Sequence, residues 1–117
     1  MKYVELYADA AGESHFRDVE IDPDTTTLPL RGDQWIANGG FRVIRRPAGR
    51  TSDFHRSPER LFGPFLAGVI EFRASDGEVR RFTTGDLFLS GDTTGKGHTT
   101  ATIGDEDAWY LCIRLDP

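Results

Sequence analysis

The chain has 117 residues, a length that suits one compact domain and is too short for two independent hydrophobic cores. Its 19 acidic residues outnumber its 14 basic ones, and the resulting net charge of −5 is the wrong sign for a general binder of nucleic-acid backbones. No apolar stretch has the length of a membrane span, and the first residues lack the apolar region of a secretory signal. We therefore expect a soluble, cytoplasmic protein that binds neither nucleic acid nor a membrane.

The distribution of glycine and proline indicates an all-β protein. Thirteen glycines and six prolines lie at intervals between short runs of Val, Ile, Phe, Leu and Thr, as in small sandwiches and barrels. No segment of ten or more residues has a helical period. The single cysteine, Cys112, excludes an internal disulfide and is expected as a small buried hydrophobe. Strands are predicted over residues 3–7, 15–21, 40–46, 66–73, 78–82, 87–89 and 108–115.

Turn signals separate these predicted strands. Residues 22–30 hold two prolines and a polar run, which predicts an irregular connector. Residues 47–49, Pro-Ala-Gly, predict a turn after the third run. The Asp76-Gly77 pair between two β-prone runs is a strong hairpin signal.

Two histidines lie among glycines at defined spacings. Gly49 and His55 bracket five residues, Gly68 lies thirteen residues past His55, and Gly95 precedes His98 with two residues between. These positions resemble the two halves of the cupin signature, G-x5-H-x-H-x(3,4)-E-x6-G and G-x5-P-x-G-x2-H-x3-N. The resemblance extends over most of the chain.

The resemblance implies a fold and an organisation. The expected fold is an all-β double-stranded β-helix, the jelly-roll barrel of the cupins. Residues 1–117 then form a single domain with a barrel core over 40–115. The N-terminal strands within 1–39 are expected as an extension that pairs across a homodimer, because such pairing would cover exposed sheet edges.

The resemblance also implies a possible metal site. Metal-binding cupins hold a divalent ion with two histidines and a carboxylate from the first half and one histidine from the second. His55 and His98 match that set, whereas Ser57 replaces the second histidine and an apolar residue occupies the carboxylate position. Glu59 is the candidate third ligand. Two alternatives stay open at this point. The chain binds no cofactor, or it holds a divalent metal weakly on His55, His98 and Glu59.

Without a metal, His55 and His98 are the candidate catalytic residues. On the resemblance they point into the barrel from facing strands, where an imidazole can act as general base or acid. The alternative is that both are pocket residues whose hydrogen bonds are satisfied by neighbouring hydroxyls. The predicted ligand-binding residues are Ser57, Asp92, Thr93, Lys96 and Trp35.

A basic cluster and an aromatic set each have two interpretations. Arg45, Arg46 and Arg50, with Arg42 nearby, can clamp a carboxylate through bidentate contacts, or form a solvated strand face. The aromatic residues either line a pocket or form the core. They are Trp35, Phe54, Phe62, Phe65 and Trp109.

Three functions remain open at the level of sequence, because one barrel fold hosts many activities. The first is a small-molecule-binding barrel, either a binding protein or an isomerase- or lyase-type enzyme that uses His55 and His98 for proton transfer. The second is a metal-dependent, dioxygenase-like oxidoreductase. The third is a non-catalytic sensing or structural module.

Overall fold

A computed structural model describes residues 1–21 and 38–116, so the predicted connector at 22–30 and Trp35 lie outside the described residues. Over these two ranges the chain forms nine strands and no helix, and in particular no helix of the length and apolarity that a membrane crossing requires. The strands are β1 (Lys2–Ala8), β2 (Ser14–Glu20), β3 (Phe41–Arg46), β4 (Leu61–Ala67), β5 (Val69–Ala74), β6 (Val79–Phe82), β7 (Leu87–Ser90), β8 (His98–Ile103) and β9 (Ala108–Arg114).

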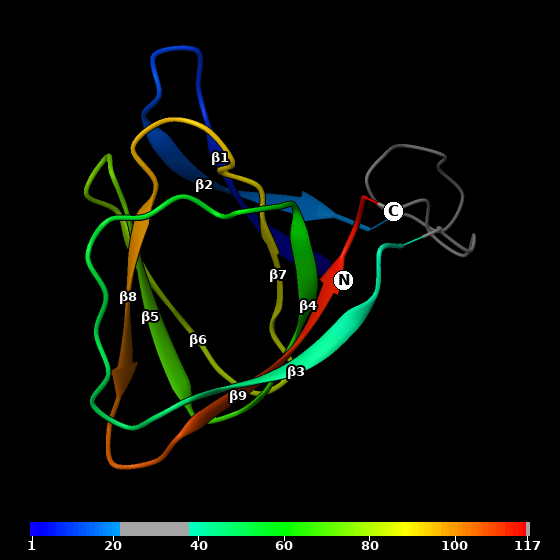
Figure 1. Cartoon of the computed structure of the whole chain (residues 1–117), viewed down its shortest axis with the longest axis vertical. Helices are drawn as coiled ribbons and strands as arrows, with labels where there is room; N and C mark the ends of the chain where they lie inside the picture. Colours follow the sequence, from blue (N-terminus) through cyan, green and yellow to red (C-terminus); the bar gives the residue numbers. More distant parts are fainter. Residues whose placement is uncertain (22–37, 117) are drawn as a thin grey trace.

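The strands form two sheets that enclose a common interior (Figure 1). The larger sheet has the order β2-β1-β7-β4-β9-β3, and the smaller sheet has the order β6-β5-β8. All described strand pairs are antiparallel except β1 and β7, which run parallel. Two facing sheets with crossovers between non-consecutive strands are the architecture of a jelly-roll barrel.

The N-terminal strands belong to the barrel itself. β1 pairs with β2 over its whole length and with β7 from Val4 to Leu6. These strands were expected outside the barrel core, whereas β1 has a hydrogen-bonded neighbour on each side within its own chain. The predicted homodimer stays a prediction.

One predicted strand is two strands in the structure. The run 66–73 was expected to be continuous, but β4 ends at Ala67 and β5 begins at Val69. The break is Gly68, whose φ of +73° favours glycine, and a Cβ atom there would lie 2.5 Å from the carbonyl oxygen of Asp107. The chain passes from the large sheet to the small sheet at this point. β8 was not predicted, because its His-Thr-Thr-Ala-Thr-Ile sequence has few apolar side chains.

The core between the sheets is built from phenylalanine rings. Phe72 and Phe82 from the small sheet meet Phe65 and Phe88 from the large one, and the centroids of Phe72 and Phe88 are 4.6 Å apart. All four side chains are buried. Their packing closes part of the interior, and the rings of Phe65, Phe72 and Phe88 also border a cavity that occupies the rest.

Candidate functional site

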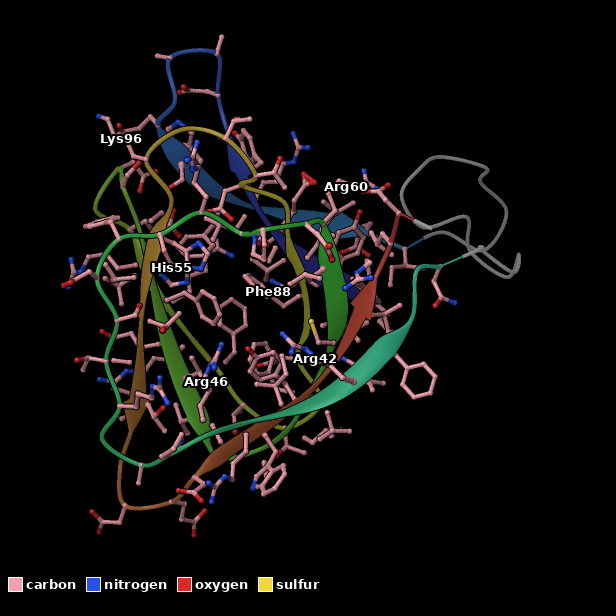
Figure 2. The ribbon with its side chains drawn as sticks, in the orientation of Figure 1. Arg42, Arg46, His55, Arg60, Phe88 and Lys96 are labelled. Carbon is pink, nitrogen blue, oxygen red and sulfur yellow. The ribbon has the colours of Figure 1, made fainter. Side chains whose placement is uncertain are left out.

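The barrel interior contains a cavity of about 310 Å³. Its walls come from both sheets and from the loop that precedes β4, and Figure 2 shows His55, Arg42, Arg46 and Phe88 directed toward this interior. The volume lies at the lower end of the roughly 300–1,000 Å³ typical of small-molecule sites. The polar lining consists of His55, His98, Arg42, Arg46, Arg50, Tyr110, Cys112, Thr51, Ser52, Ser57, Ser90, Thr100 and Thr102.

His98 forms a buried pair with Asp92. The Nδ1 atom of His98 lies 2.6 Å from Oδ2 of Asp92, and the two residues are 3% and 0% exposed. A carboxylate oxygen accepts the hydrogen bond, so Nδ1 carries the proton and Nε2 of a neutral ring has a free lone pair. Nε2 has no hydrogen bond to the described residues, and the His98 side chain lines the cavity.

His55 lies beside His98 and is oriented by the backbone. Its Nδ1 atom is 2.9 Å from the carbonyl oxygen of Asp53, which can only accept, so Nδ1 is again the protonated nitrogen. The Ser52 hydroxyl lies 3.4 Å from the same nitrogen and 3.1 Å from Oγ1 of Thr100. His55 is exposed at the mouth of the cavity, whereas His98 is buried within it.

The two histidines are neighbours on one wall. Their ring centroids are 4.6 Å apart, and their backbones exchange two hydrogen bonds of 3.0 and 2.9 Å. Both imidazoles border the same cavity. The predicted arrangement was wrong in one respect, because the residues form an isolated antiparallel bridge and do not lie on facing strands.

The basic cluster is divided between two faces of β3. Its register with β9 pairs Arg42 with Cys112 and Arg46 with Ala108, and these side chains face the interior. Arg45 faces outward, where it pairs with Asp107 at 3.4 Å. Arg50, in the following loop, also lines the cavity.

Two uncharged side chains on β9, Tyr110 and Cys112, line the cavity together with Arg42 and Arg46. Burial raises the pKa of the Tyr110 phenol, while the charges of Arg46 and Arg42 act in the opposite direction. Burial likewise raises the pKa of the Cys112 thiol, against the charges of Arg42 and Arg46. Both groups are therefore neutral near pH 7. Cys112 is buried as expected, but it borders the cavity and not a sealed core.

The predicted ligand-binding residues fall into three groups. Ser57 lines the cavity, and its hydroxyl donates to the carbonyl oxygen of Glu59 at 2.6 Å. Asp92 does not line the cavity, but its carboxylate accepts hydrogen bonds from two residues that do, His98 at 2.6 Å and the Ser90 hydroxyl at 3.5 Å. The structure does not place Thr93 or Lys96 at the cavity. Thr93 borders a different surface pocket, and Lys96 lies outside the barrel, with its Nζ 2.6 Å from Glu13 (Figure 2).

The predicted metal ligands do not come together. Glu59 pairs with Arg114 and borders the same outer pocket as Thr93, away from the cavity that holds His55 and His98. Within 1–21 and 38–116 no three His, Cys, Asp or Glu side chains are grouped to hold an ion. Two imidazoles without a third nitrogen, oxygen or thiolate donor do not fit a divalent metal site. The structure therefore does not bring Glu59 to His55 and His98, unlike the expected three-ligand set.

The aromatic set is similarly divided. Phe65 is a core residue that also borders the cavity, and Phe62 lies between the cavity and a second cluster with Tyr3 on the outer face of the sheet. Phe54 and Trp109 are exposed and do not line the cavity. Trp35 is outside the described residues.

Sequence reasoning missed Tyr110, Ser52 and Thr100 as lining residues. The signal for Tyr110 was the alternation of β9, which places it on the same face as Cys112. Ser52 and Thr100 carried no signal, because their neighbourhood depends on how the loop before β4 lies along β8.

The fold resembles that of several solved structures. The match to ToxT from Vibrio cholerae has a TM-score of 0.56 and 11% sequence identity, and it covers 68% of this chain and 31% of ToxT. A conserved protein of unknown function from Streptococcus pyogenes matches at a TM-score of 0.48, with 22% identity and coverage of 71% and 68%. The Cnp3 cupin domain of Schizosaccharomyces pombe matches at 0.49, with 20% identity and coverage of 88% and 73%. No protein-family model and no curated protein matches the sequence.

The strand order and the enclosed interior define the chain as an all-β barrel of the jelly-roll type, so the all-β jelly-roll fold predicted from the sequence is confirmed. The identities to the solved structures are low, and likeness at this level concerns the fold alone. What the barrel does must therefore be argued from the side chains that line it.

Proposed function

We propose that this chain binds a small molecule inside the barrel and moves a proton on it without a bound metal, as an isomerase- or lyase-type enzyme does. The observation that supports this most directly is the pair of His98 and Asp92. A buried carboxylate that receives Nδ1–H holds the ring in one tautomer and leaves Nε2 as a base toward the cavity. Serine hydrolases orient their catalytic histidine in the same way.

The proposed step uses only groups on the cavity wall. A C–H bond next to a carbonyl breaks, its proton passes to Nε2 of His98, and its electron pair is delocalised onto the carbonyl oxygen as an enolate. The Thr100 and Ser52 hydroxyls lie in the same wall and can donate to that oxygen. The proton returns to carbon from His98 or from a protonated His55, whose ring is adjacent. No electron is gained or lost, so the step needs no oxidant.

The test is deuterium exchange. Small carbonyl compounds and carboxylates are incubated with the protein in D2O, and deuterium uptake at carbon is followed by NMR. The wild type should catalyse exchange on at least one compound, and His98→Gln should lower the rate by roughly 100-fold or more, the usual contribution of a general base. His15→Gln is the matched control, because His15 lies outside the cavity on β2. Equal exchange rates in wild type and His98→Gln would exclude the proposed role.

A further inference from the structure

The inward face of β3 is unusual for a barrel strand. Phe41 and Val43 point outward and are 75% and 55% exposed, whereas Arg42 and Arg46 point into the interior. Strands of a barrel normally place apolar residues inward and polar residues outward. This inversion places fixed positive charge where hydrophobic packing would otherwise stabilise the fold, so the charge requires another explanation.

The cavity arginines have no acidic partner among the described residues. Six other arginines form ion pairs with Asp or Glu, but no carboxylate of residues 1–21 or 38–116 lies within 4.0 Å of the guanidinium groups of Arg42, Arg46 or Arg50. Asp92 is the buried acid of the site, and its carboxylate is used by His98. The cavity is therefore cationic although the protein carries a net charge of −5, and a half-enclosed site of one charge attracts ligands of the other.

The cavity also has an apolar lining. Phe65, Phe72, Phe88 and Ile70 form its floor, and Phe72 packs against the His98 ring with centroids 5.3 Å apart. Figure 2 shows Arg42 and Arg46 on one side of the interior and His55 on the other. A molecule that fills the cavity thus meets a guanidinium wall at one end, a phenyl floor, and the two imidazoles.

We infer that the ligand of this cavity is a small organic monocarboxylate with an apolar or aromatic body, whose carboxylate is held by Arg42 and Arg46. This rests on the proposed function, since it names the class of molecule that His98 would act on. The planar guanidinium matches a carboxylate in bidentate geometry. The cavity volume of about 310 Å³ is at the small end of the range for small-molecule sites, which favours a small ligand.

A carboxylate fits better than a phosphate. Arginine binds phosphate as well as carboxylate, but many phosphate sites add backbone N–H groups of glycine-rich loops or helix N-termini, and the described residues contain no helix. The glycines nearest the histidines are already used in close packing, because Gly95 lies against Gly12 and Gly97 against His55. No such cradle borders the cavity in the part of the chain that the structure describes.

The experiment is a calorimetric titration of the full chain with benzoate, phenylacetate and phenylpropanoate, each compared with its uncharged amide and with phenyl phosphate. At least one carboxylate should bind about tenfold or more tightly than its amide and than phenyl phosphate. Arg42→Gln and Arg46→Gln should each weaken that binding by about tenfold, the effect of losing roughly 1.4 kcal/mol. Arg45→Gln, on the same strand with an outward side chain, should leave it unchanged.

The inference is overturned if no carboxylate binds, if amide and carboxylate bind equally, if phenyl phosphate binds more tightly, or if the two cavity variants bind as the wild type does. Circular dichroism and thermal melting show whether each variant is folded. If a Gln variant unfolds, the Arg→Lys variant at that position, which keeps the charge but not the planar guanidinium, takes its place in the titration. Failure here is distinct from failure of the proton-transfer role. His98→Gln should keep carboxylate binding while losing deuterium exchange. Arg42→Gln and Arg46→Gln should weaken carboxylate binding itself.

Discussion

The carbonyl oxygen of His55 lies only 2.2 Å from the point that a Cβ atom would occupy at Gly97. This close approach lets the loop before β4 lie directly against the start of β8, and it brings the His55 and His98 rings together. Gly97 also has a φ of +78°, a conformation that L-residues rarely adopt. One glycine thus satisfies two requirements of the site.

Gly97→Ala should separate the histidines. We expect a loss of stability of at least about 1–3 kcal/mol from backbone strain and steric clash, and a change in the NMR signals of both histidine rings. Gly85→Ala is the matched control, because Gly85 has a φ of +91° with open space around it. Gly85→Ala should lower the free energy of unfolding only by the roughly 1–2 kcal/mol that a left-handed backbone conformation costs an alanine. It should leave the NMR signals of both histidines unchanged. Identical effects of the two variants would contradict the packing role of Gly97.

Asp92→Asn should change the tautomer of His98. An amide can donate as well as accept, so the proton is no longer held on Nδ1. We expect the ring nitrogen chemical shifts of His98 to move toward the Nε2–H form, together with a destabilisation of roughly 1–3 kcal/mol. Asp53→Asn should leave both histidines unchanged, because His55 uses the backbone carbonyl of Asp53 and not its side chain. A His98 spectrum unaltered by Asp92→Asn would show that the carboxylate does not set the tautomer.

Stability should depend on pH through His15. Its two ring nitrogens lie 2.8 Å from the carboxylates of Asp9 and Asp76, and the hydrogen bond to Asp9, followed by that to Asp76, raises the pKa of His15 above 6.5. The His15 hydrogen bond in turn lowers the pKa of Asp9 below 3.8. A histidine whose pKa is raised by folding stabilises the folded state fully at a pH below its unfolded-state pKa. That stabilisation is lost as the pH rises through its folded-state pKa.

The difference in stability between wild type and His15→Gln should therefore be largest near pH 5, which lies between the ordinary pKa of an aspartate, 3.8, and that of a histidine, 6.5. It should shrink as pH rises past the folded pKa of His15, and also as pH falls through the folded pKa of Asp9. Thermal melting of both proteins across this range measures it. The Lys96→Gln variant, which loses the exposed pair with Glu13, should show no such change across neutral pH. A constant difference for His15→Gln would be inconsistent with the ion pairs described.

Phe82→Ala should destabilise the barrel strongly. Phe82 is buried and packs on Phe88 and Phe65 at centroid distances of 4.8 and 5.1 Å. Truncation of a buried phenylalanine costs about 3–5 kcal/mol, measured by urea denaturation. Phe41→Ala, on the exposed outer face, should change stability by no more than about 0.5 kcal/mol. A small effect of Phe82→Ala would mean that the ring cluster is not the main core.

The sequence by itself determined the fold class and most of the strands, and it singled out His55 and His98 as residues of the barrel. These features depend on alternation, turn residues and glycine spacing within short segments. Arg42, Ile44 and Arg46 are alternate residues of β3, so any strand over this run has them on one face. Which face turned inward was decided only by the tertiary structure, since both faces of β3 mix apolar and charged residues.

The tertiary structure also decided the fates of Asp92, Glu59 and Lys96. All three are polar residues near His55 or His98 in the sequence, and nothing in their spacing distinguishes them. Asp92 became the buried partner of His98, whereas Glu59 and Lys96 found partners outside the cavity in Arg114 and Glu13. The partner of a charged side chain is set by contacts between distant segments, which the order of residues along one strand does not contain.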